Sequence, residues 1–140
     1  MRAPRWLGTT PSGQHHEVGI LLACCVAALE GWQVTYLGPN LPALEIAAAA
    51  RDSGASAVGL SIVYPEADPG LEVELRALRR ELGPGTPIVI GGRAADAFGA
   101  VCDEIHAERP GDLQALRRAL IGLQNRGARA ESGDQRAEQA

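Results

Sequence analysis

The sequence predicts an α/β fold in which a parallel sheet is covered by helices. Short apolar or β-branched runs alternate along the chain with longer segments of helical periodicity. Gly and Pro residues separate these segments, as expected at turns between elements. Because strands that alternate with helices form βαβ units with right-handed crossovers, all the strands are expected to run parallel.

Five segments have the composition of strands. Residues 4–9 are a short apolar run ended by turn residues, and residues 33–38 alternate and are β-branched. Residues 57–63 are apolar almost throughout, as in a strand that is buried on both faces. A fourth strand is predicted at residues 87–92, and a weaker fifth strand at residues 103–107.

The first helix is predicted within residues 15–32 and is expected to stop at Gly31. Its apolar residues recur at helical spacing, at Val18, Leu21, Leu22, Cys25, Val26 and Leu29. Cys24 and Cys25 lie in this apolar run, so both are interpreted as small buried side chains. Together with Cys102 they lack the CxxC spacing of a metal or redox site.

The remaining helices are predicted between the later strands, at residues 41–54, 69–83, 94–101 and 110–124. From residue 126 onward the chain is polar and poor in apolar residues, which indicates disorder. The sequence therefore predicts one folded domain over residues 1–125 and a disordered tail over residues 126–140.

Composition excludes several classes of function. The chain of 140 residues is 46% hydrophobic and 21% charged, without a signal peptide or a long uninterrupted apolar run, so a soluble cytoplasmic protein is expected and no membrane partner. A net charge of -4 argues against direct binding to nucleic acid. All 13 basic residues are Arg, which excludes Schiff-base chemistry and a P-loop lysine.

At this length, the expected arrangement is a flavodoxin-like (Rossmann-like) doubly wound sheet of five parallel strands in the order 2-1-3-4-5. Half of a Rossmann fold is the alternative, but no GxGxxG motif follows the first strand. In the 2-1-3-4-5 order, ligands bind outside the carboxyl ends of the strands, at the crevice between the first and third strands.

Three features fall at this carboxyl edge. The histidine pair His15 and His16 follows the first strand, Ser61 ends the third, and Gly91 and Gly92 end the fourth. A histidine can ligate a transition metal, a serine hydroxyl can bond a buried ring nitrogen, and glycines allow a ligand to approach the backbone. One histidine without further protein ligands suits a metal already held by a macrocycle. Taken singly, each feature also fits a solvated surface residue or a simple turn.

These residues resemble a known family. "HHEVG", "SIV" and "GG" are similar to the cobalamin-binding signature D-x-H-x-x-G, S-x-L and G-G. The gaps also agree, with 41 residues between Gly19 and Ser61 and 27 between Val63 and Gly91. The resemblance covers roughly residues 3–125 and implies a cobalamin-binding (corrinoid-binding) domain.

The resemblance implies roles for individual residues. His16 would replace the dimethylbenzimidazole base as the lower axial ligand of cobalt, while His15 has no assigned role. Ser61 would bond the displaced base, which lies in a channel beside the sheet. Gly19, Gly91 and Gly92 would make room for the base and its nucleotide tail.

Two positions depart from the signature. Gln14 stands where the motif has aspartate, and Val63 where leucine is usual. An aspartate would make the imidazole that bonds it more basic, whereas Gln14 can orient the ring but adds no charge. Valine is a mild change in an apolar channel.

The wording "PSGQHHEVG" and "VTYLGPNLP" is most similar to the sensory cobalamin domains of light-responsive MerR-type transcriptional regulators and related antirepressors. This resemblance implies a sensory module without catalytic activity of its own. It would bind adenosyl-, methyl- or hydroxocobalamin and signal through a partner protein. The helical bundle that usually caps the corrin in such proteins does not precede the first strand here, so either this is an excised or stand-alone domain or a partner supplies the cap.

Two other functions remain open. The domain could be a corrinoid carrier subunit of a methyltransferase or mutase. It could also be a degenerate, cofactor-free interaction domain. A phosphorylated receiver is disfavoured, because Thr9 and Thr10 follow the first strand and Ser61 ends the third, where a receiver needs acidic residues.

Overall fold

A parallel sheet of four strands forms the centre of the computed structural model, which describes residues 2–63 and 68–139. The strands are β1 (Arg5–Thr9), β2 (Gln33–Tyr36), β3 (Ala57–Ser61) and β4 (Ile88–Gly91). Their order is β2-β1-β3-β4. The predicted parallel α/β fold and the order of its first four strands are therefore confirmed, and the crevice between the first and third strands lies where it was expected.

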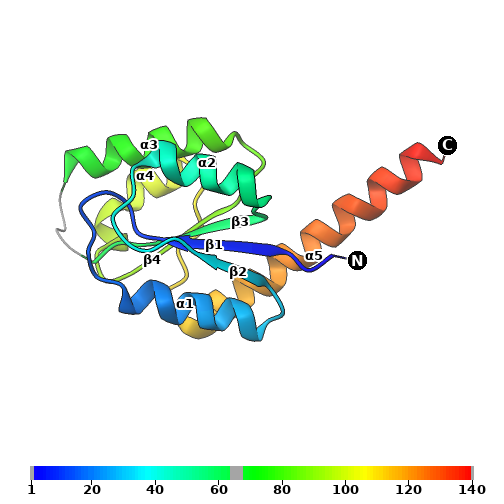
Figure 1. Cartoon of the computed structure of the whole chain (residues 1–140), viewed down its shortest axis with the longest axis horizontal. Coiled ribbons are helices and arrows are strands. Elements are labelled where there is room, and N and C mark those ends of the chain that lie inside the picture. Colours follow the sequence, from blue (N-terminus) through cyan, green and yellow to red (C-terminus); the bar gives the residue numbers. More distant parts are fainter. Residues whose placement is uncertain (1, 64–67, 140) are drawn as a thin grey trace.

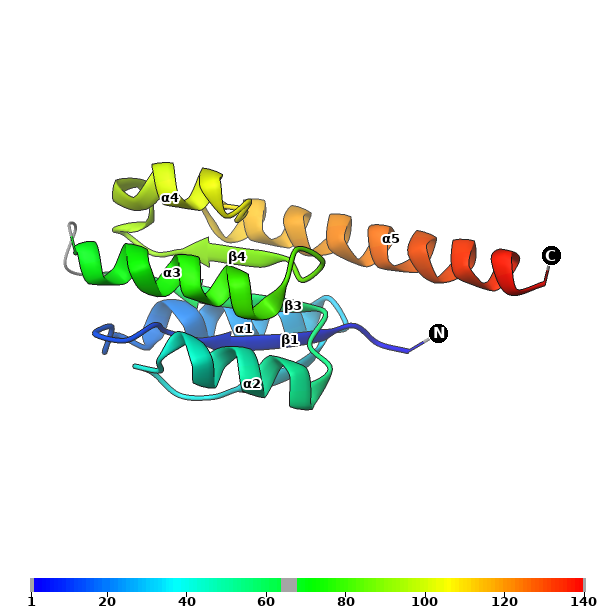
Figure 2. The ribbon, with the colours of Figure 1, turned by 90° about the horizontal axis from the view of Figure 1, so that it is seen from above.

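Helices cover both faces of the sheet (Figures 1 and 2). They are α1 (Val18–Leu29), α2 (Ala43–Ser53), α3 (Pro69–Leu82), α4 (Gly99–Glu104), which follows the short 3-10 helix η1 (Ala95–Phe98), and α5 (Leu113–Glu138). α1 and α5 pack against one face, whereas α2, α3 and α4 lie on the other.

Local sequence signals fix where several helices begin and end. The carboxylate of Asp68 accepts a hydrogen bond from Gly70 N at the start of α3, and Asp112 accepts one from Ala115 N at the start of α5. α2 ends at Gly54, whose φ of 65° is left-handed. Asp112 is therefore the N-cap of α5, which begins at Leu113 and not at residue 110 as predicted.

The predicted fifth strand at residues 103–107 is wrong. α4 continues to Glu104, and His106 has a φ of 57°, a left-handed conformation that does not occur in a regular strand. Pairing begins only at Glu108, which forms an isolated parallel bridge with Val89 of β4. One residue therefore covers the edge of β4, because the turn at His106 leaves too short a segment for a strand.

The inward face of α1 also differs from the predicted one. Five of the predicted apolar positions are exposed, namely Val18, Leu21, Leu22, Cys25 and Leu29. The buried residues of the helix are Ile20, Cys24 and Ala27. α1 is apolar around most of its circumference, so spacing alone does not select the buried stripe. Small side chains turn inward because Trp6 and Trp32, whose rings are 6.2 Å apart, occupy the space below the helix.

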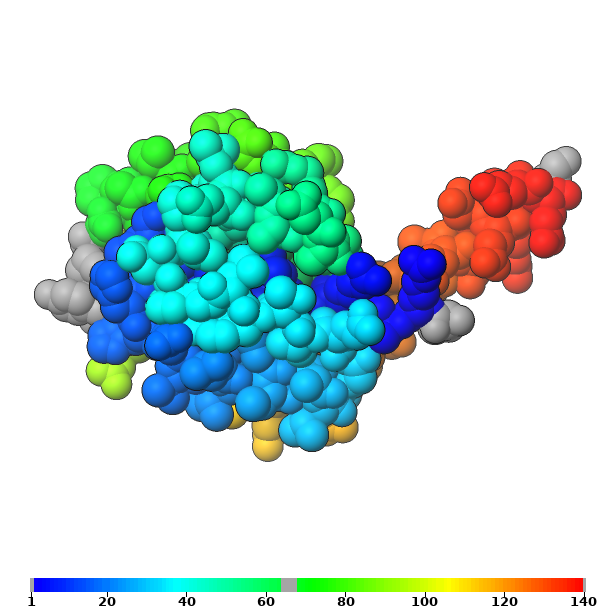
Figure 3. All heavy atoms as spheres, viewed as in Figure 1, coloured from blue at the N-terminus to red at the C-terminus, as the bar shows by residue number. Residues whose placement is uncertain are grey.

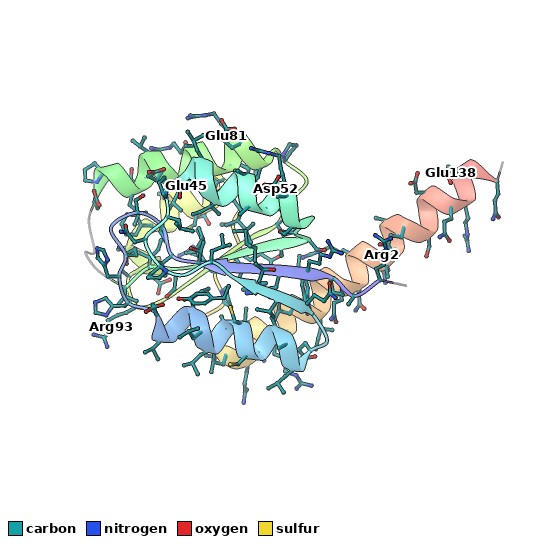
Figure 4. All side chains as sticks on the ribbon, in the orientation of Figure 1. Arg2, Glu45, Asp52, Glu81, Arg93 and Glu138 are labelled. Carbon is teal, nitrogen blue, oxygen red and sulfur yellow. The ribbon has the colours of Figure 1, made fainter. Side chains whose placement is uncertain are left out.

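The C-terminal segment is helical in the structure rather than disordered. α5 continues to Glu138 and projects beyond the body of the molecule, where residues 129–139 are exposed (Figure 3). Glu138 lies near the far end of this projection (Figure 4). The segment is rich in Ala, Arg, Glu and Gln, which favour extension of a helix that the packed residues have already nucleated. Among the described residues, no helix has the length and apolar character needed to cross a membrane.

The two faces of the sheet carry side chains of different size. Because side chains alternate along a strand, neighbouring residues face opposite layers. Towards α2, α3 and α4 the sheet presents large aliphatic side chains, namely Leu7, Val58, Leu60, Ile62, Ile88 and Ile90. Between them in sequence, facing α1 and α5, several positions have small side chains or none, namely Gly8, Ala57, Gly59, Ser61 and Gly91.

Candidate functional site

A cavity of about 190 Å³ lies between the sheet, α1 and the N-terminal part of α5. Its walls include Trp6 and Gly59 from the strands, Ile20 from α1 and Leu116 from α5. It reaches the surface beside Gly92, which is exposed. The cavity lies on the face where the sheet carries small side chains, so the space that large side chains fill on the opposite face remains open here.

Ser61 provides an unpaired hydroxyl on the wall of this cavity. The residue is only 4% exposed, and within the described part of the chain its Oγ has no hydrogen-bond partner. A buried hydroxyl without a partner costs free energy, so such a group in a native fold requires an explanation. A ligand that supplies a hydrogen-bonding atom inside the cavity would satisfy it.

Gly19 brings the start of α1 close to this hydroxyl. A Cβ atom placed on Gly19 would lie 3.0 Å from Ser61 Oγ, which is closer than ordinary contact. The residue therefore leaves the cavity open above the serine. The structure thus places the predicted residues Gly19 and Ser61 side by side.

The two predicted glycines after β4 serve different purposes. A Cβ atom on Gly91 would meet no other atom within 4 Å, so this residue borders open space in the cavity. Gly92 has a φ of 102°, and a Cβ there would lie 2.3 Å from Ile62 O. Gly92 is therefore required by the chain turn itself, whereas Gly91 leaves room for a ligand.

Gln14 lies in the loop after β1 and is buried against the end of β3. It is 1% exposed, and its Oε1 accepts a hydrogen bond of 2.8 Å from Val63 N. Its backbone oxygen accepts a bond of 2.6 Å from Thr10 Oγ1. The structure therefore brings the predicted residues Gln14 and Val63 together, and the glutamine amide oxygen ties the loop that carries the histidines to β3.

Asn40 contributes to the same network and was not predicted. Its φ is 64°, its Oδ1 accepts a hydrogen bond from Gly13 N, and its own N–H donates to Thr10 Oγ1, both at 2.8 Å. Asparagine adopts this left-handed conformation more readily than most residues. The sequence signal that could have identified it is its position directly after Gly38 and Pro39, in the loop that follows β2.

His15 and His16 lie exposed in the loop between β1 and α1. Within residues 2–63 and 68–139, no group of three or more His, Cys, Asp or Glu side chains could hold a metal ion. Among the described residues, His16 therefore belongs to no such three-ligand group. The arrangement fits a metal whose other coordination positions are filled by its own ligand.

A hydrogen bond anchors the start of α1 beside these histidines. Tyr36 OH, at the end of β2, donates to Glu17 Oε1 over 2.6 Å. Partial burial, together with the hydrogen bond and negative charge of Glu17, raises the pKa of Tyr36 to about 12. Arg93 lies at the same end of the molecule, where its side chain points away from the body (Figure 4).

The three cysteines are free thiols, and they differ in burial. Cys24 is buried beside Trp6, and burial raises the pKa of its thiol, which keeps it protonated. The prediction of a small buried side chain is confirmed for Cys24 and is wrong for Cys25, which is exposed.

Comparison with known proteins assigns the chain to a family. The sequence profile of the B12 binding domain matches residues 4–108. The HTH-type transcriptional repressor CarA of Myxococcus xanthus is 32% identical over 130 residues, which is 88% of this chain and 43% of the repressor. The repressor CarH of the same organism is 35% identical over 92 residues, covering 66% of this chain and 31% of CarH. The chain thus spans less than half the length of these relatives.

Solved structures share the fold. A cobalamin-binding protein from Desulfitobacterium hafniense matches 87% of this chain and 60% of its own, with a TM-score of 0.73 and 18% identity. The monomethylamine corrinoid protein of Methanosarcina barkeri matches 83% of this chain and 57% of its own, with a TM-score of 0.62 and 21% identity. The profile match covers most of the folded region and includes the histidine loop, Ser61 and Gly91. The chain therefore belongs to the B12-binding domain family, and its cofactor is cobalamin.

Proposed function

We propose that residues 1–125 form a sensory domain in which His16 is the lower axial ligand of cobalt and the displaced base enters the cavity beside Ser61. The observation that carries this proposal is the buried hydroxyl of Ser61, which has no hydrogen-bond partner among the described residues, in a cavity of about 190 Å³. A cofactor-free domain would have no use for such a group, because an apolar side chain at this position would be more stable.

Each proposed site residue has a contact or an opening that supports its role. Exposed His16 can reach a ligand from the loop after β1, and Gln14 anchors that loop through Val63 N. Gly19 and Gly91 keep the cavity free of side-chain atoms. The bound cofactor would supply a bond from cobalt to its upper ligand that can be broken by light or by a second protein.

The sensory role rests on the relatives CarA and CarH, which are transcriptional repressors. We propose that residues 1–125 sense the cofactor and do not themselves contact DNA. The net charge of -4 supports this proposal. We further propose that the protein acts in the cytoplasm as a photoreceptor, and that its partner supplies a helical cap over the corrin.

Absorption spectra of the purified chain test the binding mode. Methyl-, adenosyl- and hydroxocobalamin are added in the dark, and the spectra are recorded after desalting. His16→Ala is compared with His15→Ala, a matched control because both histidines are exposed in one loop. Retention of corrinoid with a spectrum that changes only in His16→Ala is the expected result. A spectrum that is the same in all three proteins would overturn histidine ligation.

The same preparations separate a sensor from a corrinoid carrier. A sensor is expected to lose the upper ligand of bound adenosylcobalamin on illumination and to change its association with a partner or with itself, measured by size-exclusion chromatography. A carrier subunit would instead give up the methyl group of bound methylcobalamin in the dark when a methyltransferase partner is added. Methyl transfer without any response to light would therefore replace the sensory role with the carrier role.

A further inference from the structure

We infer that the cavity selects corrinoids by their lower base, accepting a benzimidazole and disfavouring adenine. This inference rests on the proposed function, which places the displaced base in the cavity. It concerns which cobamides the domain binds.

The side chains that line the cavity offer few polar groups. Most lining side chains are apolar, and they include Ile20, Leu22, Ala23, Val89, Leu113 and Leu116. Ser61 Oγ, on the wall, can donate and accept a hydrogen bond and has no partner in residues 2–63 and 68–139. The carboxylate of Asp112 is exposed at the mouth and already accepts a hydrogen bond from Ala115 N.

The indole of Trp6 adds only one donor, and it is turned towards sulfur. Trp6 Nε1 has no hydrogen-bond partner within the described residues, yet it lies close to Cys24 Sγ. A Cβ atom on Gly8 would lie 2.5 Å from that sulfur and 3.2 Å from Trp6 Nε1, which places the two groups side by side. Ser61 is therefore the polar group best placed to meet a ligand.

Trp6 closes the deep end of the cavity. It pairs with Ala57 in the sheet register, four positions before Ser61 along β3. Its ring lies directly on Gly59, where a Cβ atom would be 2.0 Å from the indole. The base is thus limited in depth by a flat aromatic surface. An apolar cavity of ~150 Å³ is known to bind benzene, so about 190 Å³ has room for a somewhat larger flat ring system.

A benzimidazole matches this set of groups, and adenine does not. A benzimidazole joined to its ribose through one nitrogen has a single remaining ring nitrogen, which accepts a hydrogen bond, and an otherwise apolar edge. Adenine brings an amino group and further ring nitrogens that would each need a partner. Since burying such a group unpaired costs free energy, each is expected to weaken binding roughly tenfold.

Equilibrium binding of three corrinoids with the same upper ligands tests the inference. The full chain is titrated with cobalamin, with the adenine-containing cobamide and with cobinamide, which has no base. Wild type is expected to bind cobalamin at least roughly tenfold more tightly than the adenine form. Ser61→Ala should weaken cobalamin roughly three- to tenfold and leave cobinamide unchanged. Ser132→Ala, the same substitution on the exposed part of α5, is the control.

The outcomes separate this inference from the proposed function. Equal affinity of the wild type for cobalamin and the adenine form would overturn base selection while leaving cobalamin binding intact. Equal affinity for cobalamin and cobinamide would show that the base gains nothing from the cavity, which also overturns it. Failure to retain any corrinoid would overturn both the base selection and the proposed function. Thermal unfolding of each variant confirms that Ser61→Ala is folded before its affinities are compared.

Discussion

The two faces of the sheet are built from the same strands, but one face is filled by side chains and the other leaves a cavity. Towards α2, α3 and α4, side chains such as Ile88 and Ile90 fill the space completely, and both are fully buried. Towards α1 and α5, small residues such as Ser61 and Gly91 leave about 190 Å³ open, although the ring of Trp6 covers Gly59. The site is therefore formed mainly where residues have small side chains or none, so substitutions on the two faces should have opposite effects.

The largest effect is expected on the filled face. Ile90→Ala removes buried methyl and methylene groups and leaves a void, which should lower the free energy of unfolding by about 2–5 kcal/mol. Urea denaturation measures this loss. Cobalamin affinity of the folded fraction should stay the same, and a loss of less than about 1 kcal/mol would mean that this face is packed less tightly than described.

A pair of glycine substitutions distinguishes packed from open positions on the cavity face. Gly59→Ala places a methyl group within the ring of Trp6, so it should destabilise the fold by about 1–3 kcal/mol. Gly91→Ala meets no atom within 4 Å and should change stability by less than about 0.5 kcal/mol. Urea denaturation of both variants checks this difference. Equal losses would contradict the assignment of Gly91 to open space.

Ser61→Ala should behave unlike an ordinary deletion of buried atoms. Because its hydroxyl has no partner in the described residues, the ligand-free protein should lose no stability and should gain about 1 kcal/mol or less. The same variant binds cobalamin more weakly under the inference above. A clear loss of stability in the absence of corrinoid would show that Ser61 has a structural role instead.

The smallest effect concerns the start of α1 and depends on pH. The pKa of Tyr36 is raised to about 12 from its ordinary value of 10. Between pH 10 and about 12 the folded state therefore keeps this proton, whereas the unfolded state has lost it. The stability that results is fully present below pH 10 and is lost as the pH rises through about 12. Because the chain has two tyrosines, a Tyr64→Phe background leaves Tyr36 as the one that is measured. The pH midpoint of its tyrosinate absorbance should fall when Glu17→Gln is added.

Much of the site could be predicted from the sequence, because the carboxyl ends of parallel strands lie at the same edge of the sheet. Ser61 and Gly91 each end a readable strand, and they pair in the register of β3 and β4. The paired glycines looked equivalent in sequence, although only the structure separates open Gly91 from Gly92, whose left-handed turn lies against Ile62 O.

Other features depended on tertiary contacts that no local pattern contains. The buried stripe of α1 was mispredicted, because it is set by the tryptophans beneath the helix. Asn40 was missed because its partners Gly13 and Thr10 lie about 30 residues away along the chain. The fifth strand was overestimated, since composition alone does not reveal the left-handed turn at His106.

α5 is both a wall of the cavity and the longest helix of the described chain. Its first turns contribute Leu113 and Leu116 to the cavity, while its end stands clear of the body. With 26 residues and a rise of ~1.5 Å per residue, it is a rod of about 39 Å. A tilt of ~5° at the cavity would therefore displace the far end by roughly 3 Å. A ligand that pushes α1 and α5 apart would therefore move the C-terminal end of α5 farther than it moves the residues that contact the ligand.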